Sequence, residues 1–417
     1  MKKRFRLALV VLVLGVIGLL GYCALGGGAL RPMGPPEGVT VSIPFGAIDI
    51  DDVQTGLKAS ALERSLVESM RTESPQGFDP GRDGVRRYQV LAISGGGSNG
   101  AFGSGFMNGW TASGTRPDFN VVTGVSTGAF QALFVFLGPD YDPMLKEIYT
   151  IYTGDLIAVK RSPLAALFND STWDLSPLGE VIQSNVTDEL LAAVAAKHEA
   201  GYRLYVGTTN LDTAEFVIWD MGLIAASGRP GAREHFVRIL LASASVPVLF
   251  PPVYFEVEGD DGNTYFEMHV DGSTFSQVFF RGFLLEIEDA VEILKPTEEV
   301  NVKLYIIRNG KLEDVEKRSN VKASVPSIAG RTIESLFKIT LRASLYRMYV
   351  LARKYDIDFN VAAIPNDFEL DLDPLLFEDE GLRRLYDLGY RLGSEDYQWI
   401  KSPPKLDPSE VIKQRTG

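Results

Sequence analysis

Cysteine is nearly absent from this chain: Cys23 is the only one in 417 residues. An intramolecular disulfide is therefore excluded, and stability must come from a hydrophobic core. Basic residues are not in excess either, because 41 Lys and Arg stand against 54 Asp and Glu and give a formal net charge of −13. We expect no nucleic-acid partner, since phosphate binding needs a basic surface.

Histidine is also scarce, with only His198, His235 and His269, which are scattered along the sequence. These residues and one cysteine make no metal-ligand cluster, so we expect neither a metal nor a cofactor in the chemistry. The sequence lacks internal repeats and low-complexity tracts. Its 45% hydrophobic and 23% charged residues are ordinary for a globular protein, and its length suffices for one large core or two modest ones.

The N-terminal segment has the features of an export signal. Four of the first six residues are basic, and Leu7 to Leu20 is apolar without a charge. Leu20 to Cys23 resembles a bacterial lipobox, whose cysteine is lipidated, although Tyr22 is larger than the residue expected there. An uncleaved anchor is the alternative, because the apolar run continues to Leu30. Either alternative predicts membrane attachment in the bacterial cell envelope, with the rest of the chain outside the cytoplasm.

A GxSxG motif centres on Ser126. The run Phe119 to Val122 before it predicts a buried strand, and Ala129 to Leu137 after it predicts a helix. A serine at the tip of a tight strand-to-helix turn needs a strained backbone, and Gly124 and Gly128 remove the Cβ atoms that would clash there. Ser126 is therefore the candidate nucleophile.

A second glycine-rich turn precedes this motif by about 30 residues. Tyr88 to Ser94 predicts a strand, Gly95 to Gly100 is the turn, and Ala101 to Trp110 predicts a helix. Such a turn presents bare backbone N–H groups at a helix N-terminus, where they can bind a phosphate or a developing oxyanion. Two strand–turn–helix units so close together favour a functional site over two turns without a ligand.

The second turn also satisfies the dinucleotide fingerprint GxGxxG through Gly95, Gly97 and Gly100. That fingerprint needs an acidic residue at the end of the next strand, about 20 residues on. Asp118 has the spacing but precedes the next apolar run instead of ending it, which disfavours a dinucleotide site. A P-loop is disfavoured too, because no Gly-Lys-Ser/Thr follows the glycines.

Three motifs together resemble the patatin-like phospholipase family: Gly95 to Ala101, Gly124 to Gly128, and Asp271-Gly272. The resemblance spans about Tyr88 to Ser273 and implies a Ser-Asp dyad with a glycine-loop oxyanion hole. Two positions depart from the family, since Asn99 replaces the usual Arg and Ser273 replaces Gly or Ala. The residues implied are Ser126 and Asp271 as the dyad, Gly95, Gly96, Gly97 and Ser98 as the oxyanion hole, and Gly100, Gly124, Gly128 and Gly272 as motif glycines.

A histidine base remains an alternative to the dyad. Asp271 cannot be the acid of a Ser-acid-His series, because no histidine follows it. Asp212 or Asp220 with His235 or His269 would preserve that order, so a triad stays open. Direct proton acceptance by Asp271 is the better fit, provided that burial raises its pKa above the reference value of about 3.9.

Alternating strands and helices elsewhere predict a three-layer α/β/α domain with a mainly parallel sheet. We expect residues 1–30 to be the signal or anchor, 31–87 a tether and cover, 88–365 the patatin-like catalytic domain, and 366–417 a helical extension. The predicted helices are Tyr141 to Tyr152, Leu178 to Lys197, Phe236 to Leu241 and a segment from Ile333 to Met348. The predicted strands are Tyr202 to Thr209, Glu215 to Asp220, Phe266 to Val270, Val302 to Ile307 and Phe359 to Ile364. Between Lys311 and Ser327 we expect a polar insertion.

These features predict a lipid acyl hydrolase: a phospholipase A, a lysophospholipase or an esterase. Ser126 would attack an ester carbonyl, the glycine loop would bind the oxyanion, and water would release a fatty acid. The family resemblance implies a phospholipid or another acyl-ester lipid as the substrate, and the predicted anchor, which reaches a membrane, agrees with it. Two alternatives stay open: acyl transfer to an alcohol at the same site, and a non-enzymatic lipid-binding envelope scaffold.

Overall fold

The computed structural model describes residues 31–48, 61–72, 86–151, 154–162, 169–280, 300–313, 320–369 and 379–404. The predicted signal or anchor of residues 1–30, with Cys23, lies outside these ranges, as do parts of the predicted cover and of the C-terminal extension. Among the helices of the described ranges, none combines the length and the uniform apolar character needed to cross a bilayer.

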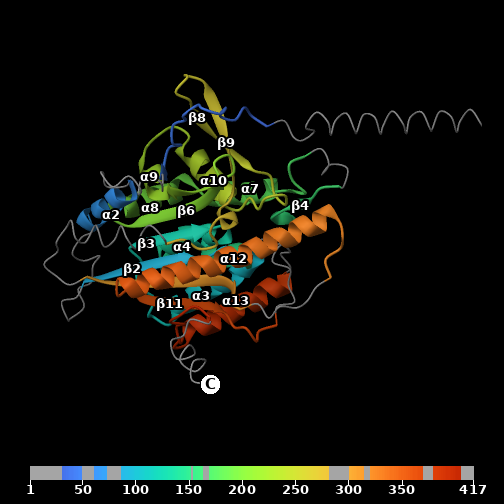
Figure 1. The fold of residues 1–417 in the computed structure, drawn as a ribbon. Helices are drawn as coiled ribbons and strands as arrows, with labels where there is room; N and C mark the ends of the chain where they lie inside the picture. The colour runs from blue at the N-terminus through green and yellow to red at the C-terminus, as the bar shows by residue number, and fades with distance from the viewer. Residues whose placement is uncertain are drawn as a thin grey trace, which may run out of the picture.

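A central sheet organises the molecule, with strand order β1-β7-β6-β3-β2-β10-β11 (Figure 1). The five strands from β6 to β11 in this order are parallel to one another, whereas β7, β1 and the β8–β9 hairpin are antiparallel additions. The strands are β1 Ala47–Ile48, β2 Arg86–Ile93, β3 Val121–Val125, β6 Arg203–Asn210, β7 Glu215–Asp220, β8 Val253–Glu258, β9 Thr264–Asp271, β10 Val300–Lys311 and β11 Asp358–Ile364; β4 Val159–Lys160 and β5 Trp173–Asp174 pair separately.

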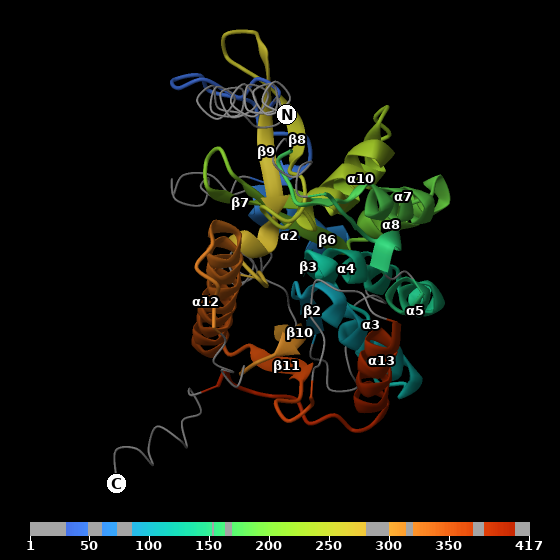
Figure 2. The same cartoon turned by 90° about the vertical axis from the view of Figure 1, so that its right-hand side faces the viewer.

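Helices cover both faces of the sheet, so the predicted α/β class with a mainly parallel sheet is confirmed. Figure 2 shows α12 on one side of the sheet and α3, α4, α5 and α13 on the other. The helices are α2 Ala61–Thr72, α3 Gly100–Ala112, α4 Thr127–Leu137, α5 Asp142–Thr150, α7 Ser176–Asn185, α8 Asp188–Glu199, α9 Met221–Ala226, α10 Ala232–Ser243, α12 Val325–Lys354 and α13 Asp379–Ser394.

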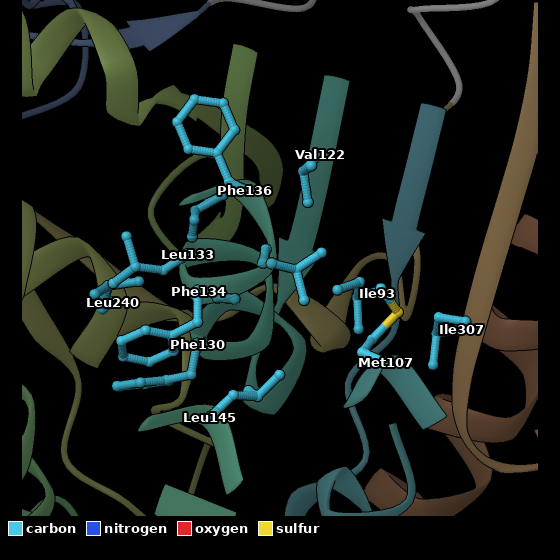
Figure 3. Close-up of a cluster of buried hydrophobic side chains, with 14 of the residues drawn as sticks. Ile93, Met107, Val122, Phe130, Leu133, Phe134, Phe136, Leu145, Leu240 and Ile307 are labelled. Carbon is cyan, nitrogen blue, oxygen red and sulfur yellow. The ribbon is translucent and has the colours of Figure 1, made fainter. Parts of the chain in front are cut away.

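Alternate residues of the central strands enter different cores. In β2, Leu91 and Ile93 pack with α3, α4 and α13, whereas Val90 and Ala92 pack with α2 and α12. Because successive side chains of a strand point to opposite faces, a strand covered on both faces must be apolar throughout, which explains the continuous apolar runs in the sequence. Figure 3 shows part of the core on the side of α3, α4 and α13, where the α4 side chains lie beside Leu240 of α10.

The predicted single helix from Leu178 to Lys197 is wrong, because the chain forms two helices there, α7 and α8. Val186 leaves the helical conformation with φ −84° and ψ 76°. Thr187 then caps α8, since its side-chain oxygen accepts a hydrogen bond from the N–H of Leu190 at 3.2 Å. A threonine cap satisfies one of the N–H groups left over at a helix start, so the break is locally stable.

Two further segments differ from the sequence expectations. Strand β8 was not predicted, and the polar insertion from Lys311 is shorter than expected because α12 already begins at Val325. The described residues 31–48 also pair with the β8–β9 hairpin, through Phe266 N–H to Met33 O at 2.9 Å and Ser42 N–H to Glu258 O at 2.8 Å. This part of the predicted tether therefore lies against the domain.

Helices α3 and α13 pack so closely that their backbones meet at glycines. Gly105 and Gly109 of α3 lie against the α13 backbone, and Gly389 and Gly393 of α13 lie against the α3 backbone. An added Cβ at Gly393 would collide with the carbonyl oxygen of Phe106 and lie 2.8 Å from the nitrogen of Trp110. The contact fixes the position of α3 against α13.

Gly393→Ala is expected to destabilise the protein by about 2 kcal/mol, because overpacking against a rigid backbone typically costs 1–3 kcal/mol. Glycine to alanine in an open helix position has the opposite sign and gains up to about 1 kcal/mol. Gly330→Ala in α12 is the matched control, since an added Cβ there meets no atom within 4 Å. Urea unfolding of both variants measures the difference; a stabilised Gly393→Ala protein would contradict the close packing.

Candidate active site

Ser126 lies at the turn between β3 and α4 and is only 6% exposed. Its φ of 56° and ψ of −129° fall in a region that residues with a side chain rarely adopt. Such a conformation costs about 1–3 kcal/mol and persists where neighbouring groups hold it. Here the N–H of Ser126 donates to Ser243 Oγ at 2.9 Å, and that hydroxyl donates to the carbonyl oxygen of Gly207 at 2.8 Å.

The glycines of the turn allow the two strand ends to meet. An added Cβ at Gly128 would lie 2.5 Å from the carbonyl oxygen of Ile93 and 2.6 Å from that of Ser94. The first turn of α4 therefore presses against the end of β2, which brings the two predicted strand–turn–helix units together. The other motif glycines, Gly100, Gly124 and Gly272, are in similarly close contact with their neighbours.

Asp271 ends β9, where the strand pairs with β6 next to Thr208. Its side chain is fully buried, and Oδ1 accepts a hydrogen bond from the N–H of Ser273 at 2.7 Å. Burial raises the pKa of the Asp271 carboxyl from 3.8 to about 6, against a partial lowering by the hydroxyl of Ser126 and by Ser273. A carboxylate with this pKa is a much better base near neutral pH than an exposed one.

The Ser126 hydroxyl and the Asp271 carboxylate are neighbours. The hydroxyl lowers the pKa of Asp271 as a hydrogen-bond donor does, yet Oδ2 of Asp271 has no hydrogen-bond partner of regular geometry among the described residues. The lack of a regular bond is compatible with a working pair, since hydrogen bonds of catalytic groups are often long or poorly aligned without substrate. The structure thus brings the two predicted dyad residues, more than 140 positions apart, into one site.

Of the predicted oxyanion loop from Gly95 to Ser98, Gly96 and Gly97 line the site cavity, whereas Ser98 is fully buried and does not line it. The N–H of Gly95 is engaged, because it donates to the carbonyl oxygen of Gln277 at 3.0 Å. The N–H groups of Gly96 and Gly97 have no backbone acceptor within the described ranges, and they precede the N-terminus of α3. Backbone N–H groups at a helix N-terminus are suited to bind a developing negative charge.

Three side chains that the sequence analysis missed hold this loop. Arg308 donates from Nη1 to the carbonyl oxygen of Gly95 at 2.8 Å. The buried amide of Asn309 donates to the carbonyl oxygen of Ser94 at 2.8 Å and to Gln131 Oε1 at 2.7 Å. Gln131 in turn donates to the carbonyl oxygen of Gly100. Both ends of the loop are therefore fixed by α4 and by β10.

A signal for these side chains exists in the sequence, although it is weak. Arg308 and Asn309 follow directly after the apolar run Val302 to Ile307, and polar residues at the carboxyl end of a parallel strand commonly face a site. Arg308 also puts a guanidinium beside the loop in which Asn99 replaces the usual arginine. Asn99 itself is buried and lines the site cavity.

Each of the three histidines contacts groups other than Ser126 and Asp271, although His269 lies on β9 only two residues before Asp271. His198 faces Asp220 at 3.7 Å between Nδ1 and Oδ1, and the Nε2 atom of His235 is 2.8 Å from the carbonyl oxygen of Phe45. His269 is fully buried, with Nδ1 3.0 Å from Thr208 Oγ1. Among the described residues that line the site cavity there is no histidine. The geometry therefore disfavours the triad alternative with Asp212 or Asp220.

A cavity of about 1950 Å³ opens above Ser126 and Asp271. Part of its wall is an apolar cluster of Ile157, Leu175, Val246 and Phe250, with Phe337 of α12 packed against it. The volume exceeds the roughly 300–1,000 Å³ of common small-molecule sites. Other parts of the wall carry charged side chains, among them Arg308 and Arg342, so only the apolar cluster is suited to hold an acyl chain. No cluster of three potential metal ligands occurs within the described parts of the chain.

The site combines three features at one edge of the α/β sheet: a strained serine between a strand and a helix, a buried carboxylate, and a glycine loop. Such an arrangement is chemically suited to acyl transfer. The family model described as patatin-like phospholipase matches residues 91–284, so the chain carries a patatin-like phospholipase domain over this range. The family consists, in general terms, of lipid acyl hydrolases.

Solved structures that match this chain include VipD from Legionella pneumophila, at 12% identity and a TM-score of 0.33, with 73% of this chain and 66% of that chain covered. Another is human GIVD cytosolic phospholipase A2, at 10% identity and a TM-score of 0.35, with 87% and 65% covered. The chain thus spans just under two thirds of either protein. No curated protein matches the sequence.

Proposed function

We propose that this chain is a serine lipid acyl hydrolase in which Ser126 is the nucleophile and Asp271 is the general base. The single observation that carries the proposal is the pair itself: a fully buried carboxylate, with Oδ2 unpartnered among the described residues, beside the hydroxyl of a strained serine. A purely structural Asp-Gly turn requires neither the burial nor the neighbouring serine. The domain family supports a lipid ester as the substrate.

The reaction would proceed through an acyl-enzyme. Ser126 Oγ attacks the ester carbonyl carbon while its proton passes to Asp271 Oδ2, and the N–H groups of Gly96 and Gly97 stabilise the oxyanion. The protonated Asp271 then donates that proton to the departing alcohol as the ester bond breaks. Water, deprotonated by Asp271, attacks the acyl-enzyme, and the fatty acid leaves with Ser126 restored.

The substrate proposal is a phospholipid or lysophospholipid at a membrane. The apolar cluster beside Ser126 suits an acyl chain, and the predicted N-terminal anchor would hold the domain at the envelope membrane, outside the cytoplasm. Lipidation at Cys23 and an uncleaved anchor remain alternatives within this proposal. Both bring the cavity close to the bilayer in which its substrate resides.

Product analysis tests the proposal. The full chain is incubated with phospholipid vesicles, with and without an added primary alcohol, and the released fatty acids and new esters are measured by mass spectrometry. We expect free fatty acid in both samples. Ester formation that dominates with the alcohol would assign the site to acyl transfer, and the absence of both products from correctly folded protein would support a lipid-binding scaffold instead.

A further inference from the structure

Helix α12 has apolar side chains on two opposite faces. Leu341, Leu345 and Met348 point inward and are at most 6% exposed. Large apolar residues also recur on the outer face, where a soluble surface helix usually carries polar ones. These residues form an outer stripe of Ile328, Leu336, Ile339 and Val350, which are 53%, 47%, 65% and 60% exposed. At 3.6 residues per turn the four positions fall within a sector of about 80° around the helix axis.

The same helix is strongly basic in an acidic protein. Its sequence contains six basic residues and one acidic residue, a formal charge of +5 against −13 for the whole chain. The acidic residue, Glu334, is shared by Arg331 at 2.6 Å and Lys338 at 3.0 Å. A basic helix with an exposed apolar stripe has the composition of helices that lie in the surface of an anionic bilayer.

The position of α12 connects this stripe to the candidate active site. The helix lines the cavity above Ser126 with Phe337, Leu341 and Arg342, among others. Figure 2 shows α12 at one edge of the molecule, away from the helices on the other side of the sheet. A surface that contacts the outer stripe would therefore also lie beside the cavity.

A bilayer suits the stripe better than a second copy of the chain. Two copies that met through this face would oppose two helices of charge +5, which is unfavourable. Anionic lipid instead satisfies both features, since its head groups attract Lys and Arg and its acyl region takes up isolated Ile and Leu side chains.

We infer that α12 is a membrane-docking helix: the outer stripe inserts into the surface of an anionic bilayer, the basic residues contact its head groups, and the cavity above Ser126 opens to the lipid. The inference rests on the proposed function for its substrate, because docking serves a lipid hydrolase. Docking itself needs no catalysis, so the two are tested separately.

A fluorescent reporter on the stripe tests the docking. In full chain with Cys23→Ser and Ser126→Ala, Leu336→Cys is labelled with an environment-sensitive fluorophore, and the protein is reconstituted into phosphatidylcholine vesicles with or without phosphatidylglycerol. Leu223→Cys is the matched control, because Leu223 is a helical leucine of similar exposure, 45%, on α9. We expect a blue shift at position 336 that requires phosphatidylglycerol, and none at position 223.

Two results would overturn the inference: an unchanged emission at position 336 on anionic vesicles, or a change that depends on protein concentration without vesicles, which indicates a second copy. In the active protein, Leu336→Asp should lower fatty-acid release from anionic vesicles by about tenfold, since a charge replaces an apolar side chain that docking would bury in the bilayer. Leu336→Asp should hydrolyse a water-soluble short-chain ester at the rate of the parent protein. The control variant Leu223→Asp should match the parent protein on this soluble ester as well. A parent protein without any ester hydrolysis would refute the proposed function and leave the fluorescence result standing.

Discussion

Asp271→Asn should lower kcat/KM for an ester substrate by about 10²- to 10⁴-fold, the usual contribution of a general base. The amide cannot accept the proton of Ser126, although its oxygen can keep the hydrogen bond from the N–H of Ser273. Initial rates on a soluble ester and on phospholipid vesicles measure the loss. Asp220→Asn serves as the control for the histidine alternative, and its kcat/KM should remain near that of the parent.

The pH profile adds a second test of the same residue. With the pKa of Asp271 at about 6, the base is protonated and inactive below that pH and ionised above it. The kcat/KM of the parent should therefore rise through pH 6 and level off, and the residual activity of Asp271→Asn should lack this rise. A fully active Asp271→Asn protein would contradict the dyad and favour a histidine base.

The free energy of unfolding provides the control for folding in Asp271→Asn. The substitution should lower activity but raise stability, so a loss of activity could not be explained by unfolding. The pKa of Asp271 is raised in the folded state, from 3.8 to about 6, so its favourable contribution is present below pH 3.8 and is lost as pH rises through 6. At pH 8 the ionised carboxylate costs the fold about 3 kcal/mol. Asp271→Asn should therefore unfold at higher urea concentration than the parent at pH 8, and the difference should shrink toward pH 4.

Gly96→Ala should lower kcat by about 10²- to 10³-fold, the typical effect of losing an oxyanion donor. A Cβ added at Gly96 would collide with the carbonyl oxygen of Asn309, and it would lie 2.7 Å from the Cβ atom of Asn309. Since Asn309 is held by Ser94 and Gln131, the loop has to move instead, and the N–H groups of Gly96 and Gly97 move with it. Single-turnover rates on a soluble ester report this step.

Gly393→Ala is the control for Gly96→Ala, because it introduces a comparable backbone collision toward the far end of α3 from the loop. At a temperature where both variants remain folded, Gly393→Ala should keep kcat within a few-fold of the parent. Equal losses in the two variants would mean that general destabilisation, and not the oxyanion loop, explains the effect of Gly96→Ala.

The sequence predicted the parts of the site that are coded locally. A serine between glycines, a glycine loop and an Asp-Gly pair each lie next to an apolar run, and short-range geometry determines how such units fold. Ser126 and Asp271 share a site because β3 and β9 both pair with β6. The family resemblance implied this shared site, whereas the spacing of the two residues in the sequence did not.

Features that depend on distant contacts escaped prediction. Arg308 and Gln131 hold the glycine loop from other elements, and the glycines of α13 matter only because α3 lies against them. The break at Val186 escaped too, because the apolar periodicity continues across it and only the cap at Thr187 decides the boundary. The exposed stripe of α12 could not be told from a core face, since both have helical spacing.

Reaction with a fluorophosphonate, followed by intact-mass analysis, tests the activated serine most directly. The full chain and its Ser126→Ala variant are treated in parallel after their folding has been verified by circular dichroism. The proposal predicts one covalent adduct on the parent protein and none on Ser126→Ala, with the adduct forming more slowly in Asp271→Asn. An unmodified parent protein, or an adduct that persists in Ser126→Ala, would contradict the assignment of Ser126 as the nucleophile.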